Sequence, residues 1–266
     1  MDYFIRSFKF ALRIFIKSPA FSLIAVVALA LGIGAVTSMF SVINGAVIRG
    51  LPFEEPDELM FVKRWDKERA PWRTSIPILD YQDILRDQNS FESLAGWFGG
   101  TVNVSIGNNP IRFNGSRISH TWLDILKVNP IIGRGFTAEE DSPGAPPVLI
   151  LGYAAWQSHY SGDPEVIGKT ANVNGVPGTV IGVMPKNFQF PNEDDVWVPL
   201  NSQINFTNVK RGDNDISIMG RLNDGMNREQ AELEITNIIT RLAQEFPDTN
   251  GDFVVASVEP IAGALL

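Results

Sequence analysis

The sequence predicts a membrane-anchored α+β protein, in which one N-terminal transmembrane helix precedes a mixed α+β domain. Residues 18–48 carry no formal charge, and Lys17 and Arg49 flank them. The residues after Arg49 are predominantly acidic and contain both helical and strand-like segments. Because these segments do not alternate strictly, the pattern favours an α+β arrangement over a doubly wound sheet.

The composition excludes several classes of function. The chain of 266 residues has a net charge of −8; residues 1–49 contribute +4, so the remainder carries −12. Such acidity argues against nucleic-acid binding, which needs clustered Lys and Arg to neutralise phosphates. The chain has no cysteine, which excludes disulfides and thiolate metal sites. Its two histidines, His120 and His159, leave little material for a metal centre or an acid–base relay.

The charge-free run over 18–48 is long enough to cross a bilayer. As a helix it would extend about 46 Å, against a hydrocarbon core of about 30 Å. We expect the surplus to continue outside the bilayer as a short stalk, because polar residues interrupt the run toward its end. Small residues form two pairs at a spacing of four, which either permit close packing with other membrane helices or reflect ordinary membrane-helix composition. These residues are Ala28, Ala30, Gly32 and Gly34.

Basic residues before this run set its orientation. Arg6, Lys9, Arg13 and Lys17 follow one another at spacings of three, four and four, which places them on one stripe of a helix. We therefore expect residues 1–17 to form an interfacial amphipathic helix that is attracted to anionic lipid. The positive-inside rule then places the N-terminus in the cytoplasm and the bulk of the chain outside it. A cleavable signal peptide fits poorly, because its apolar region would be shorter and a small-residue cleavage site would follow.

The part of the chain after Arg49 contains clear local signals. Asn174-Gly175 predicts a type I′ turn between two strands, since both residues accept positive φ. Asn227 and Gln230 have the spacing of a capping box at the start of a long helix. Periodicity predicts helices over 77–87, 120–128, 153–160 and 227–246. It predicts strands over 59–65, 101–106, 111–118, 148–151, 170–173, 179–184, 196–198, 216–222 and 254–258.

Candidate chemical motifs are weak, so we predict no catalytic, cofactor-binding or metal-binding residue and no enzyme activity. Gly162 to Thr170 resembles a P-loop, but it has five residues between its glycines instead of four and precedes a hairpin. The clusters 139–141 and 193–195 have three acidic residues each, without the spacing of a calcium loop, and are interpreted as solvated loop charge. His120 is interpreted as the start of a helix. Most of the six tryptophans are expected in the core.

Several segments together resemble the MacB/FtsX-type ABC transporter permeases, and among them the acidobacterial-type permease group. The segments cover most of the chain in the expected order. They are ALRIFIKSPAFSLIAVVALALGIGAVTSMFSVINGAVIRGLPF, GRGFTAEED, PVLILGYAAWQSHYSGDPEVIGKTANVNGVPGTVIGVMP, VWVPL and GRLNDGMNREQAELEITNIITRLAQEFPDTN.

The resemblance implies a MacB-like periplasmic core domain over 50–266, with up to two subdomains, on an inner-membrane helix over 18–48. It implies a mechanical transmitter: a cytoplasmic ABC ATPase and further permease helices would drive the domain, within a homo- or heterodimer, to expel or extract substrates. Because those helices are not in the sequence, we expect the chain to be a fragment or a short form. The alternatives are a membrane-tethered binding or chaperone module independent of ATP and, less well supported, a hydrolase that uses His120 or His159.

Overall fold

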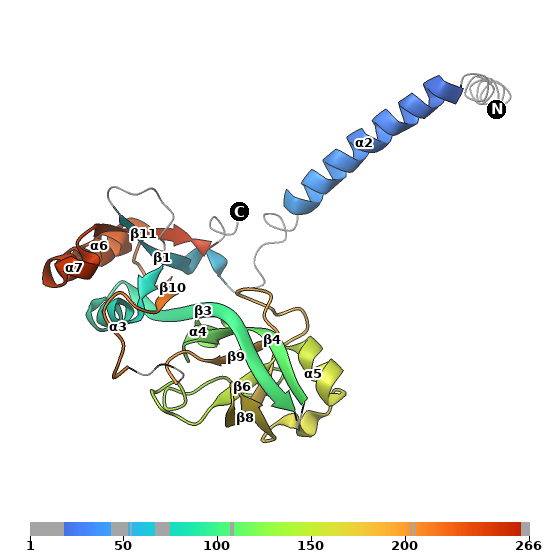
Figure 1. Cartoon of the computed structure of the whole chain (residues 1–266). Helices are drawn as coiled ribbons and strands as arrows, with labels where there is room; N and C mark the ends of the chain where they lie inside the picture. The colour runs from blue at the N-terminus through green and yellow to red at the C-terminus, as the bar shows by residue number, and fades with distance from the viewer. Residues whose placement is uncertain are drawn as a thin grey trace. The chain divides into compact units, whose positions relative to one another are not determined.

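A computed structural model describes residues 19–43, 53, 55–66, 75–106, 109–202, 204 and 206–261. These residues form two units, one that contains the first described helix and one that begins at Phe53 (Figure 1). Each unit is described by itself below.

The first unit contains helix α2, which spans Pro19–Ile43. Its described apolar side chains are exposed, including Ile24 at 69% and Val36 at 70%. No helix in the described part of the chain meets the length and apolarity that a membrane crossing requires. The transmembrane span expected over 18–48 therefore stays a prediction, and residues 1–17 lie outside the described residues.

The second unit is a mixed α+β domain, as the sequence predicts. Eleven strands of the described residues join in one hydrogen-bonded network, in the order β11-β1-β10-β3-β4-β9-β6-β8-β5, with β2 on β10 and β7 bridging β3 and β8. The strands are β1 Leu59–Asp66, β2 Ile76–Pro77, β3 Phe91–Ile106, β4 Asn109–Ile118, β5 Ile132–Gly133, β6 Val148–Leu151, β7 Thr170–Val173, β8 Val176–Val183, β9 Val196–Pro199, β10 Asp215–Leu222 and β11 Phe253–Pro260. The helices are η2 Pro56–Glu58, α3 Ile78–Asp87, α4 Trp122–Leu126, α5 Tyr153–Tyr160, η3 Pro164–Val166, α6 Arg228–Glu245 and α7 Pro247–Asn250.

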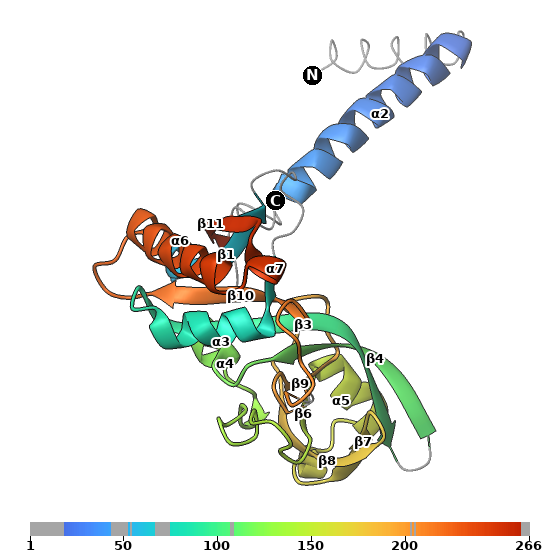
Figure 2. The ribbon, with the colours of Figure 1, turned by 60° about the vertical axis from the view of Figure 1, so that its left-hand side comes forward.

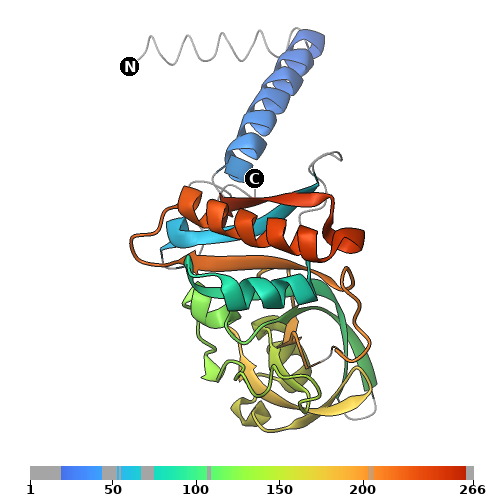
Figure 3. The ribbon, with the colours of Figure 1, turned by 90° about the vertical axis from the view of Figure 1, so that its left-hand side faces the viewer.

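Two hydrophobic clusters of described residues, here called the first and the second core, lie in different parts of this unit. In the first, α3 and α6 cover one face of the sheet formed by β11, β1, β10 and the first half of β3 (Figure 3). The second core joins the far half of β3 to β4, β6, β7, β8, β9 and α5 (Figure 2). Parallel pairing of β4 with β9 and of β6 with β8 occurs beside antiparallel pairs, which confirms the α+β class.

Strand β3 connects the two cores, and its first half is the main element that the sequence did not predict. Its residues from Phe91 to Gly100 pair with β10 and β4, but only residues 101–106 were expected to be extended. Glycines weaken the strand pattern here. Gly96 is required by packing, since a Cβ at this position would lie 2.6 Å from Cδ1 of Ile216.

The strongest local signals are confirmed. Asn174 and Gly175 have φ of 52° and 92° and connect β7 to β8 as a type I′ turn requires. Asn227 caps α6 through the backbone N–H of Gln230, and the Gln230 side chain accepts from the backbone N–H of Asn227. The helix predicted over 227–246 is α6, and its apolar residues from Ala231 to Ala243 lie at helical spacing and are buried.

Candidate functional site

The two ends of the domain lie side by side. Strand β1 begins at Leu59 and strand β11 ends at Pro260, and these strands pair antiparallel with Met60 opposite Pro260. The chain therefore enters and leaves the domain at the same end of one strand pair. Any displacement of the segment before β1 acts on this end of the sheet.

Arg221 fixes the segment before β1, here called the leading segment (Phe53 and Glu55–Glu58). Its side chain is 4% exposed and belongs to β10, where Arg221 pairs with Leu59. Nη1 donates to the carboxylate of Glu58 at 2.8 Å and to the backbone oxygen of Glu55 at 3.3 Å. Nε and Nη2 donate to the backbone oxygen of Ile125, at 3.3 and 2.9 Å, near the end of α4. One buried guanidinium thus ties the leading segment to β10 and α4.

Lys127 makes a second tie between α4 and the leading segment. Its ammonium group forms an ion pair with the carboxylate of Glu55. The hydrogen bond from Lys127 holds the pKa of Glu55 below its usual value. Lys127 has φ of 53°, and its backbone N–H closes the last turn of α4. Because both side chains of this pair are exposed, we expect it to contribute less than the Arg221 contacts.

An apolar contact completes the attachment, through a series of aromatic rings here called the aromatic row. Phe53 is buried and lies edge-on to Phe190, with ring centroids 5.2 Å apart. Phe190 stacks on Trp122 at 5.5 Å, and Trp122 contacts Trp97 at 4.9 Å. Trp97 in turn contacts Phe61 of β1 at 5.5 Å. The row connects the leading segment with α4, β3 and β1, so these elements are coupled by packing as well as by charge.

The sequence motifs that suggest chemistry have structural roles. The P-loop-like run lies between α5 and β7, as expected, and its Lys169 pairs with Asp163 at 2.6 Å. In the described ranges, no group of three or more His, Cys, Asp or Glu residues could hold a metal ion. His120 lies two residues before α4, which begins at Trp122 and not at His120 as predicted, and its Nδ1 contacts the carboxylate of Asp141 at 3.4 Å.

The interpretation of both acidic clusters as solvated loop charge is wrong for one residue in each. Asp141 is 3% exposed and Asp194 is 2% exposed. Asp141 accepts from the backbone N–H groups of His120 and Asn201, so it joins two loops. Asp194 accepts from the hydroxyl of Ser116 at 2.7 Å. A buried carboxylate is tolerated where it accepts hydrogen bonds from otherwise unpaired donors, although its sequence context indicates a loop.

The residues predicted for membrane contact lie apart from this site. Arg6, Lys9, Arg13 and Lys17 fall outside the described residues. The four small residues lie on α2 and are exposed, and a Cβ added at Gly32 or Gly34 would meet nothing within 4 Å. Their role in helix packing stays a prediction.

Sequence reasoning missed Arg221 and the aromatic row. A charged residue at the end of the apolar run Ile216–Leu222 was the available signal, since a charge in a buried strand needs partners. Glu55 and Glu58 belong to a largely acidic stretch shortly after Arg49. Their partners are more than 60 residues away in the sequence, so no local pattern could identify them.

Two solved structures share this fold. One is the periplasmic region of MacB from Actinobacillus actinomycetemcomitans, 19% identical, with a TM-score of 0.59 over 82% of this chain and 94% of that one. The other is the extracellular domain of the noncanonic ABC-type transporter YknZ from Gram-positive bacteria, 16% identical, with a TM-score of 0.52 over 75% of this chain and 98% of that one. A comparison with proteins of curated function finds no match.

The family comparison covers most of the chain. The model of the MacB-like periplasmic core domain matches residues 22–238, so the match begins within α2 and ends within α6. This confirms the family that the sequence segments resemble. The chain belongs to the MacB-like periplasmic core domain family.

Proposed function

We propose that this chain is part of an ABC transporter permease and that its extracytoplasmic domain converts ATPase-driven motion of membrane helices into efflux or extraction of a substrate. The single observation that carries the proposal is the attachment of the leading segment. Arg221, Lys127 and the aromatic row connect this segment to β10, α4, β3 and β1. A pull on it would therefore be distributed over the sheet instead of unravelling one strand.

The adjacency of the two ends supports a domain inserted between two membrane helices. Because Met60 pairs with Pro260, preceding and following helices could be neighbours without a long connection. Relative motion of such helices would shear β1 against β11. In the proposed assembly a cytoplasmic ABC ATPase and further permease helices are the partners, within a homo- or heterodimer.

The membrane anchor of this proposal is the helix over 18–48, with the basic stripe of residues 1–17 at the inner-membrane lipid surface. The absence of formal charge from 18 to 48 supports it. The exposed apolar side chains of α2, such as Leu31 at 69%, also support it, since water is an unfavourable surrounding for so many of them. The acidic domain would lie on the periplasmic side, by the positive-inside rule.

A topology experiment tests the location. Alkaline phosphatase fused after Ile261 should be active, and green fluorescent protein at the same position should be dark in a Gram-negative host, because the fusion point lies outside the cytoplasm. A matched fusion before Lys17 should give the opposite pair of results. A fluorescent, phosphatase-inactive fusion after Ile261 would contradict the proposed location.

A genetic experiment tests the mechanism. In the native host, an ATPase partner that binds ATP but cannot hydrolyse it should produce the same loss of efflux as removal of this chain, and both changes together should produce no further loss. A chain that retains its effect beside the inactive ATPase would contradict force transmission. That result would instead support the ATP-independent binding module, which one observation favours: the domain has a cleft of about 700 Å³ away from the leading segment.

A further inference from the structure

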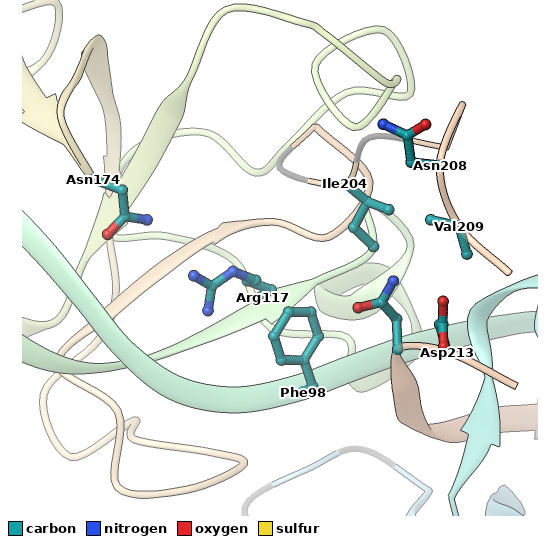
Figure 4. Close-up of a pocket in the computed structure, with 8 residues that line it drawn as sticks. Phe98, Arg117, Asn174, Ile204, Asn208, Val209 and Asp213 are labelled. Atoms are coloured by element: carbon teal, nitrogen blue, oxygen red, sulfur yellow. The ribbon is translucent and has the colours of Figure 1, made fainter.

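The cleft lies between the β3–β4 pair and the segment that connects β9 to β10. Phe98 of β3 and Arg117 of β4 form one wall, and Ile204, Asn208, Val209 and Asp213 belong to the connecting segment (Figure 4). The cleft shares no residue with the leading segment or the aromatic row. Binding of a ligand in the cleft is therefore independent of force transmission through the leading segment.

Arg117 gives this cleft its chemical character. It is half-buried and lies opposite Phe98 in the β3–β4 register, with its guanidinium carbon 4.8 Å from the ring centroid. Burial lowers the pKa of Arg117. Across the ranges that the structure describes, it has no carboxylate or carbonyl partner within bonding distance. A guanidinium in this position has its N–H donors available to a ligand, while the ring holds its plane.

The opposite wall is fixed in place before any ligand arrives. Ile204 is buried, and Val209 packs against the first core. Arg211 follows on the same segment and forms ion pairs with Asp80 at 2.6 Å and Asp83 at 2.7 Å. The wall therefore offers two apolar side chains, Ile204 and Val209, beside the polar Asn208 and Asp213, and ion pairs of Arg211 tie its segment to α3.

The charges of the cleft select among anions. Asp213 lines the same cleft as Arg117, and its carboxylate is exposed. Because the carboxylate of Asp213 opposes any added negative charge in the cleft, a ligand with one negative charge is disfavoured less than a ligand with two. The amide of Asn208 adds one donor and one acceptor. These features favour a carboxylate over a phosphate.

We infer that this cleft binds a small ligand in which a carboxylate is attached to an apolar group. The carboxylate accepts two parallel hydrogen bonds from Arg117, and the apolar group contacts Ile204 and Val209. Tight binding needs both parts of the ligand. An isolated carboxylate leaves Ile204 and Val209 in contact with water, and an uncharged ligand leaves the half-buried guanidinium without a counter-charge.

The test uses the full chain in lipid nanodiscs and three probes: N-acetyl-L-phenylalanine, its uncharged amide, and inorganic phosphate. Equilibrium dialysis should show that the acid binds at least tenfold more tightly than either other probe. Arg117→Gln should abolish this preference, and Arg117→Lys should keep part of it, because a lysine retains the charge but not the paired donors. Arg112→Gln, on the same strand and exposed, should bind the acid as the unaltered protein does.

Thermal unfolding shows whether each variant is folded. Asn208→Ala provides a variant on an exposed position, and we expect it to weaken binding of the acid two- to tenfold without changing the unfolding midpoint. Equal affinity for the acid and its amide, equal affinity for phosphate, or unchanged affinity in folded Arg117→Gln would each overturn the inference. None of these outcomes depends on an ATPase, so failure here and failure of force transmission are distinguishable.

Discussion

At the scale of single residues, the domain uses a few buried polar side chains as connectors. Asp194 accepts from the hydroxyl of Ser116 and from the backbone N–H of Asn192 at 3.2 Å. Burial raises the pKa of Asp194 to about 6, from an ordinary value of 3.8. The hydrogen bonds from Ser116 and Asn192 oppose this shift but do not cancel it.

Asp194 should make stability depend on pH. Its pKa is higher in the folded than in the unfolded state, so between about 4 and about 6 the folded state binds more protons and stability falls as the pH rises. Asp194→Asn should remove this slope, since its side-chain oxygen can still accept both hydrogen bonds. Urea unfolding at pH 4.5, 5.5 and 7 measures it. Glu193→Gln, at an exposed neighbouring position, should leave the slope unchanged; an unchanged slope in Asp194→Asn would contradict the assignment.

His120 is a base and Asp194 is an acid, but the effect of His120 on stability has the same sign. A raised pKa of His120 also makes stability fall as the pH rises. The hydrogen bond to Asp141 raises the pKa of His120 above its ordinary 6.5, against the effect of burial. The stabilisation is fully present below the unfolded value and is lost as the pH rises through the folded one. The difference in unfolding free energy between the unaltered protein and His120→Gln should therefore be larger at pH 5.5 than at pH 8.5. His159→Gln, which is exposed, should show no such change.

At the scale of elements, α6 closes the edge of the sheet. Strand β11 is the last strand of its side and would present unpaired backbone groups. The hydroxyl of Thr236 accepts from the backbone N–H of Ala256 at 3.2 Å, and the carboxylate of Glu232 accepts from that of Val258 at 3.0 Å. Thr240 donates to the backbone oxygen of Val254 at 3.1 Å. Successive turns of α6 thus provide hydrogen-bond partners for the backbone groups on the outer edge of β11.

Removal of one of these hydrogen bonds should lower the free energy of unfolding by more than an average substitution at the surface does. Thr236→Val keeps the shape of the side chain but leaves the N–H of Ala256 without an acceptor, which costs about 1–3 kcal/mol. Urea unfolding measures the loss, and amide hydrogen exchange at Ala256 should accelerate. Thr249→Val, at an exposed position of α7, should change stability by less than about 0.5 kcal/mol. Equal effects of the two substitutions would show that α6 does not protect this edge.

At the scale of the whole molecule, the attachment of the leading segment predicts a local loosening that can be measured. Arg221→Gln removes the donors to Glu58 and leaves the backbone oxygen of Ile125 unsatisfied, at a cost of about 1–3 kcal/mol. Hydrogen exchange should accelerate in the leading segment and in α4, and remain unchanged in the second core. In the complete transporter, ATP hydrolysis should continue while efflux falls.

The control for this experiment is Arg228→Gln, because Arg228 is exposed at the start of α6 and pairs only with its neighbour Glu229 among the described residues. It should leave both exchange and efflux unchanged. Equal efflux in Arg221→Gln, despite faster exchange of the leading segment, would show that force does not pass through this attachment.

Local elements of this protein were predictable because their causes are local. The helix within the charge-free run, the Asn174-Gly175 turn and the Asn227 capping box each depend on residues within a few positions. The family was identifiable for the same reason, since its characteristic segments are contiguous. Local sequence patterns of this kind predicted the α+β class, the helix before the domain and most strand boundaries.

The tertiary structure alone decided which charges are buried and what they hold. Asp141, Asp194 and Arg117 have ordinary polar surroundings in the sequence, whereas Arg221 lies in an apolar run, and all four become buried or half-buried through segments distant along the chain. Whether a charge is solvated depends on the partners that packing brings to it, and hydrophobic periodicity contains no information about those partners. The attachment of the leading segment and the Arg117 cleft were therefore determined by the fold.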